Sequence, residues 1–150
     1  MSLSKPALHT ACQAFIEQRI AAARAAMDAA QESALSDTKS SAGDKYETGR
    51  EMAGAERERN AAQLLQAQQQ LAELNRISPD AACDTVRPGA LLRTSLGWFY
   101  LAISAGKLVV EGQEVFAVSA AAPVALALKG KRAGEEAVFN GKVLRVEEVR

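Results

Sequence analysis

Apolar positions in residues 1–78 recur at steps of three and four, the spacing that places side chains along one face of an α-helix. Two such stripes are separated by a polar segment, residues 36–52, that contains two of the three glycines of this part of the chain. Two stripes of similar length joined by a polar turn predict an antiparallel coiled-coil hairpin over residues 1–78. The first stripe is formed by Leu8, Cys12, Phe15, Ala23, Met27, Ala30 and Ala34, and the second by Ala55, Ala62, Leu64, Ala67, Leu71, Leu74 and Ile77.

The pattern changes at Pro79, after which short runs rich in β-branched and aromatic residues alternate with turn residues. Such runs are typical of strands. One segment, residues 121–130, breaks the series and predicts a short helix, with Pro123 in its first turn and Gly130 at its end. The fold class that we expect is α+β, with a small antiparallel sheet following the hairpin. The predicted strands are residues 90–95, 97–104, 106–112, 113–119, 136–140 and 142–149.

The change of period predicts two folding units. We place the hairpin at residues 1–78, a linker with prolines at residues 79–88, and the β domain at residues 89–150. Trp98, Phe99, Phe116 and Phe139 are expected to fill the small core of the β domain, and the single histidine, His9, is expected at the surface.

Charge and composition exclude several classes of function. Lysines and arginines number 18, as do aspartates and glutamates, so no long-range field favours nucleic acid or an anionic membrane. We therefore expect no independent DNA binding and no membrane association, and any nucleic-acid role would run through a protein partner. No window is apolar enough to span a bilayer or to serve as a signal peptide. Cys12 and Cys83 are too few for a disulfide scaffold. A cytoplasmic monomer with reduced thiols is expected.

The segment Gly43–Met52 contains two carboxylates, Asp44 and Glu47, at a spacing of three. This spacing suits a helix start, since an aspartate N-cap accepts a hydrogen bond from a backbone amide and a glutamate three residues later returns one. A pair of carboxylates at the tip of a hairpin also suits magnesium, which binds through one or two protein oxygens and keeps several waters. Both interpretations are compatible with the residues alone.

The order of these features resembles the bacterial Gre-type transcript cleavage factors, which combine an N-terminal coiled-coil hairpin that has an acidic tip with a C-terminal domain of FKBP-like fold. Near the C-terminus, "APVALALKGKRAGEE" is similar to the family's S-P-I-(A)-x-A-L-(I)-G-K-x-x-G-D/E segment. At the tip, "GDKYETGREM" is similar to the family's G-D-x-x-E-N-A-E-Y, and Asp44 and Glu47 fall on its two metal-binding acids.

The resemblance implies a transcription elongation factor that binds bacterial RNA polymerase through the secondary channel. It implies that Asp44 and Glu47 help to recruit a second Mg²⁺ in that complex, so that the polymerase itself hydrolyses backtracked RNA. Lys45, Tyr46 and Thr48 would be tip contacts near the RNA 3′ end. The protein would be a cofactor of the polymerase and no enzyme by itself.

Two alternatives stand beside this interpretation. The tip has Tyr46 where the family has lysine, and Thr48 where it has asparagine. A non-cleaving regulator of the same channel would share every global feature and differ only in tip chemistry. A peptide-binding or prolyl-isomerase module of FKBP-like fold would require an apolar pocket lined by aromatic residues.

Overall fold

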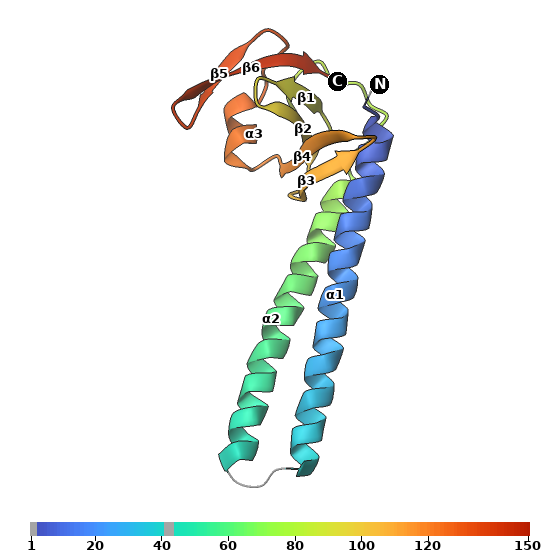
Figure 1. Ribbon diagram of the computed structural model, residues 1–150, viewed down its shortest axis with the longest axis vertical. Coiled ribbons are helices and arrows are strands. Elements are labelled where there is room, and N and C mark those ends of the chain that lie inside the picture. Colours follow the sequence, from blue (N-terminus) through green and yellow to red (C-terminus); the bar gives the residue numbers. More distant parts are fainter. Residues whose placement is uncertain (1–2, 41–43) are drawn as a thin grey trace. The chain divides into compact units, whose positions relative to one another are not determined.

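The computed structural model describes the backbone of residues 3–40 and 44–150, and the side chains of residues 3–32, 51–52 and 54–150. It is an α+β protein in which two long helices precede a six-stranded sheet and one short helix (Figure 1). The predicted fold class is therefore confirmed.

The two long helices are α1, Lys5–Ser40, and α2, Asp44–Asn75. The start of α1 is capped by Ser4, whose Oγ accepts a hydrogen bond from the Ala7 amide at 3.4 Å. Pro6 lies in the first turn, where its missing amide proton costs no hydrogen bond. α2 closes with tighter bonds from the Arg76 and Ile77 amides to carbonyls three residues back.

The chain forms two compact units, residues 1–15 with 72–150, and residues 16–71. In the second unit α1 and α2 run antiparallel, side by side (Figure 1). Arg19 Nη1 donates a 2.9 Å hydrogen bond to Gln70 Oε1 between them. Among the described side chains of this unit, the buried ones are mostly alanines, which let two helices approach closely: Ile16, Ala23, Ala30 and Ala67.

Asn60 lies in the same α2 stripe as Ala67, at the seven-residue spacing of a heptad. Its Nδ2 is buried and has no hydrogen-bond partner among the described residues. A polar amide at such a position is a known means of fixing the register of paired helices, at a cost in stability.

The sheet has the strand order β3-β4-β2-β1-β6-β5. Each predicted strand has a counterpart within it: β1 Leu91–Thr94, β2 Gly97–Ala102, β3 Gly106–Val110, β4 Gln113–Ser119, β5 Glu136–Phe139 and β6 Lys142–Val149. The predicted short helix is α3, Pro123–Leu128, between β4 and β5. Two of the hairpins turn through paired left-handed residues, Glu111–Gly112 and Asn140–Gly141, as two-residue type I′ turns require.

The sheet is mixed, and in this respect the prediction of an antiparallel sheet is wrong. β2 and β4 pair in parallel, with Phe99 opposite Phe116, while the other four pairs of neighbouring strands are antiparallel. β3 occupies the edge and pairs with the far side of β4. Alternation of apolar and polar residues shows which face of a strand is buried, but it does not show the direction of the neighbouring strand.

The core of the first unit lies on both faces of the sheet. On one face, residues of α3 and of the loop before β1 pack against alternate strand residues: Cys83, Val86, Ala90, Leu92, Phe99, Leu101, Ala125, Leu128, Leu144 and Val146. Tyr100, on the opposite face, is fully buried and is hydrogen-bonded to His9 of α1. The beginning of α1 is therefore part of the same compact unit as the sheet.

Candidate functional site

The predicted tip spans the end of α1 and the start of α2. α1 ends at Ser40, α2 begins at Asp44, and residues 41–43 lie outside the described residues. α2 therefore begins at the first of the two acids. Because Glu47 is three positions further along the same helix, both acids occupy positions on one helical face.

The side chains of the predicted tip residues lie outside the described side chains. This applies to Asp44 and Glu47 as proposed Mg²⁺ ligands, and to Lys45, Tyr46 and Thr48 as proposed tip contacts. Their roles remain predictions. Among the described residues, no group of three His, Cys, Asp or Glu side chains is placed to hold a metal ion.

The segment 122–135 is described completely, and its first half shapes the end of α3. Pro123 opens the helix, while Ala125 and Leu128 are buried in the core. Gly130 adopts φ 77° just beyond the helix, the left-handed conformation that glycine favours there. Its amide donates to the Val86 carbonyl at 2.9 Å, so that the end of α3 is joined to the loop before β1.

The second half of the segment forms a turn that is tied to β6. The Arg132 amide donates to Glu135 Oε1 at 2.9 Å, and the Glu135 amide returns a bond to the Arg132 carbonyl at 3.0 Å. Gly134 and Val146 are linked by a 2.7 Å backbone hydrogen bond. The residues that carry the resemblance in this segment therefore have local structural roles that favour the observed turn and helix end.

His9 is buried, and the expectation of a surface position is wrong. Only 7% of its surface is exposed, and its Nδ1 shares a 3.1 Å hydrogen bond with the hydroxyl of Tyr100. Burial lowers the pKa of His9 below its usual 6.5, because removal from water disfavours the charged ring.

Phe116 departs from expectation in the opposite sense: it is 36% exposed, since β4 lies next to the edge strand.

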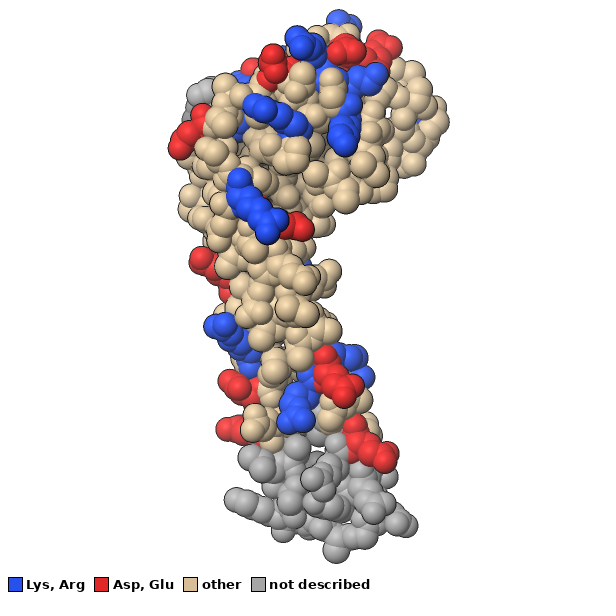
Figure 2. Space-filling model, turned by 180° about the vertical axis from the view of Figure 1, so that it is seen from behind, with Lys and Arg blue, Asp and Glu red and all other residues tan. Residues whose placement is uncertain are grey.

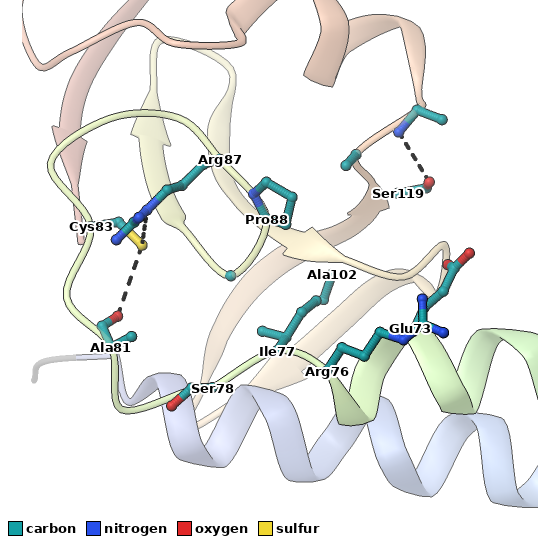
Figure 3. Close-up of a pocket in the computed structure, with 13 residues that line it drawn as sticks. Glu73, Arg76, Ile77, Ser78, Ala81, Cys83, Arg87, Pro88, Ala102 and Ser119 are labelled. Carbon is teal, nitrogen blue, oxygen red and sulfur yellow. Dashed lines mark hydrogen bonds between the residues drawn. The ribbon is translucent and has the colours of Figure 1, made fainter.

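A cavity of about 500 Å³ lies in the first unit, among the end of α2, the loop before β1, and the ends of β2 and β4 (Figure 3). Arg76 and Arg87 line it, Glu73 lies on the α2 side, and Cys83 and Arg87 lie together on the loop. Sequence reasoning missed this site. Its only signal is a cysteine followed four residues later by an arginine in a short irregular segment.

Cys83 is contacted by two cationic side chains. Arg87 Nε donates a hydrogen bond to its Sγ at 3.3 Å, and Lys5 Nζ lies 3.9 Å from the same atom. This hydrogen bond raises the pKa of Arg87. Burial lowers the pKa of Lys5, and its ammonium also donates to the carbonyls of Ala81 and Arg150 at 2.7 and 3.2 Å.

A second, smaller cavity of about 190 Å³ is lined by Val86, Arg87, Pro88, Leu101, Ala120, Ala125 and Lys129. Neither of these two cavities is lined by an aromatic side chain. A pocket built to hold a proline ring would be expected to contain such side chains.

The outer surface has charges of both signs. Figure 2 shows lysine, arginine, aspartate and glutamate side chains on the same face. Within the described part of the chain, no helix combines the length and the apolar character needed to cross a membrane. No known protein family and no curated protein sequence matches the chain.

Proposed function

We propose that this protein is a bacterial transcription elongation factor that binds RNA polymerase through the secondary channel and stimulates cleavage of backtracked RNA. The observation that carries the proposal is the order of elements. A helical hairpin precedes a small sheet domain, and the segment resembling the Gre-type family forms α3 and the turn after it. The proposal includes an FKBP-like class for the sheet domain.

The proposed division of roles follows this order. The sheet domain would provide most of the affinity for the polymerase, and the residues at positions 44–48 would act on the transcript. Asp44 and Glu47 would hold Mg²⁺ jointly with carboxylates of the polymerase. A bound Mg²⁺ would supply charge stabilisation for phosphodiester hydrolysis. Lys45, Tyr46 and Thr48 would contact the displaced RNA end, and the free protein would hydrolyse nothing.

The position of the two acids at the start of α2 is compatible with both interpretations, helix capping and metal binding. In the free protein, Asp44 and Glu47 occupy positions in the first turn, where the helix dipole favours negative charge. The same pair is available to a metal only when a partner provides further oxygens, because two carboxylates do not complete an octahedral site. Docking would therefore convert a helix-starting pair into a metal-binding pair.

The test uses a backtracked elongation complex of bacterial RNA polymerase, purified full-length protein and Mg²⁺. The wild-type protein should shorten the RNA, while the D44N/E47Q double variant should bind the polymerase and leave the RNA intact, because neutral amides are poor ligands for Mg²⁺. Asp28→Asn, an exposed acid elsewhere on α1, serves as the matched control and should retain cleavage.

Two results would overturn the cleavage proposal. If wild-type protein binds polymerase and yields no shortened RNA at any Mg²⁺ concentration, the non-cleaving regulator replaces it. If the protein does not bind polymerase at all, both channel-binding proposals fail. Cleavage by D44N/E47Q at the wild-type rate would leave the acids with a helix-capping role only.

A further inference from the structure

The cavity beside Cys83 has the size and the chemical groups of a small-molecule site. Its volume of about 500 Å³ falls within the range of roughly 300–1,000 Å³ that is typical of such sites. Its wall combines a nucleophilic side chain, Cys83, with two guanidinium groups, Arg76 and Arg87, and a single acid, Glu73. All of these residues belong to the first unit.

The sulfur of Cys83 is set among cations. Arg87 Nε at 3.3 Å and Lys5 Nζ at 3.9 Å both approach Sγ, and the Lys5 side chain is itself almost fully buried, with 8% of its surface exposed. The nucleophile in thiol chemistry is the sulfur, and both cationic side chains are placed to donate a hydrogen bond to the Cys83 sulfur. Figure 3 shows Cys83 and Arg87 side by side on the loop before β1.

The second cysteine provides an internal comparison. Cys12 is fully buried, and it lines neither of the two cavities described above. Burial raises the pKa of its thiol to about 11, so that it stays protonated near neutral pH. Both thiols are buried, but Cys83, which has 7% of its surface exposed and contributes to the core, also has cationic neighbours and lines the cavity, whereas Cys12 has 0% of its surface exposed.

We propose that this cavity binds a small disulfide that has carboxylate groups, and that Cys83 forms a mixed disulfide with it. The Cys83 sulfur attacks one sulfur of the reagent and forms a new S–S bond while the original S–S bond breaks. The other half of the reagent leaves as a thiolate and takes up the proton that Cys83 gives up. One thiol and one disulfide are consumed and one of each is formed, so no further oxidant is needed.

The arginines specify the chemical class of the reagent. A guanidinium pairs with a carboxylate through parallel hydrogen bonds, which a lysine or a neutral side chain does not reproduce. Arg76 lies on the cavity wall at the end of α2, opposite the loop that holds Cys83. A reagent attached to Cys83 would therefore place a carboxylate near Arg76.

The test is incubation of the full-length protein with glutathione disulfide, followed by intact mass measurement and peptide mapping. One glutathionyl group should be added, at Cys83, and a reducing agent should remove it. Cys83→Ser should gain none, and Cys12→Ser should react like the wild type. Trp98 fluorescence before the incubation verifies that each variant is folded.

Arg76→Gln tests the recognition of carboxylate separately from the reactivity of the thiol. It should slow reaction with glutathione disulfide by roughly two- to fivefold, the effect of a partly exposed ion pair. Reaction with bis(2-hydroxyethyl) disulfide, which has no carboxylate, should keep its rate. Arg132→Gln, an exposed arginine outside the cavity lining, should change neither rate.

Three outcomes would overturn the proposal. One is the absence of an adduct on the folded wild-type protein, and another is equal modification of Cys12 and Cys83. The third is an Arg76→Gln variant that slows both disulfides equally or slows neither. None of these outcomes depends on RNA polymerase.

Discussion

At the scale of single residues, the His9–Tyr100 pair makes the stability of the protein depend on pH. The folded state favours the neutral ring, since burial lowers the pKa of His9. In the unfolded state the ring gains a proton below about pH 6.5, its ordinary pKa. The unfolded state then binds more protons than the folded state, so this contribution to stability is fully present above pH 6.5 and is lost as the pH falls toward the lowered pKa.

We predict that His9→Asn reduces the loss of stability between pH 7.5 and 5.5, because the amide does not titrate and can still bond to the Tyr100 hydroxyl. The measurement is the urea midpoint of the wild type and the variant at both pH values. Glu148 does not interfere, since the pKa of its carboxylate is lowered from 4.5 by its hydrogen bond to Arg150 and its effect lies at more acidic pH. An equal change of the urea midpoint between the two pH values in the wild type and the variant would contradict the prediction.

The sequence did not indicate the position of His9, and the reason is physical. A single histidine near the start of a helix has no periodic signal, and its burial depends on a hydroxyl from Tyr100, which is 91 positions away. The exposure of Phe116 was missed for a similar reason: its apolar character predicts burial, whereas the position of β4 near the edge of the sheet limits it.

At the scale of elements, the pairing of α1 and α2 contains a local cost at Asn60, whose buried Nδ2 has no hydrogen-bond partner among the described side chains. We predict that Asn60→Leu stabilises residues 16–71 by about 1–2 kcal/mol, since an unsatisfied buried donor costs about that much and leucine also favours helix. Urea unfolding followed by helical circular dichroism measures the effect.

Gln69→Leu is the matched control for this change. Gln69 is exposed on α2, so its replacement alters helix propensity without removing a buried donor. It should shift the free energy of unfolding by much less than Asn60→Leu. If the two substitutions have the same effect, the buried amide has no particular cost.

The elements themselves could be predicted well, since each depends on local signals. Runs of β-branched and aromatic residues between turn residues indicated the strands, and Pro123 with Gly130 delimited α3. The parallel pairing of β2 with β4 could not be predicted, because both directions give the same alternation. The tip acids follow from spacing and resemblance alone, and the cavity beside Cys83 joins residues from four separate segments.

At the scale of the whole molecule, the first turns of α1 belong to the compact unit that contains the sheet. Leu8 is fully buried there, so a substitution in this helix should affect the sheet. We predict that Leu8→Ala lowers the free energy of unfolding by about 2–5 kcal/mol. The fluorescence of Trp98, in β2, reports the transition.

Leu65→Ala provides the comparison for the same chemical change. Leu65 is 56% exposed on α2 and lies in the other unit, so its truncation should leave the Trp98 transition close to that of the wild type. A small effect of Leu8→Ala on this transition would mean that the sheet is stable without the beginning of α1. The same experiment tests the predicted boundaries at residues 78 and 89, because Leu8 lies in the predicted hairpin and Trp98 lies in the predicted β domain.

The two ends of the described chain are joined by hydrogen bonds. Arg150 Nη1 donates to the Leu3 carbonyl at 3.1 Å, and Lys5 Nζ donates to the Arg150 carbonyl. A short peptide could replace this closure, and the ring could be reopened at the exposed turn Asn140–Gly141. In such a circular permutant β6 would come first and β5 last. The order of motifs along the chain would then change while every strand pairing persisted. The activity of the permutant would therefore show whether function depends on the order of the motifs or on the three-dimensional fold.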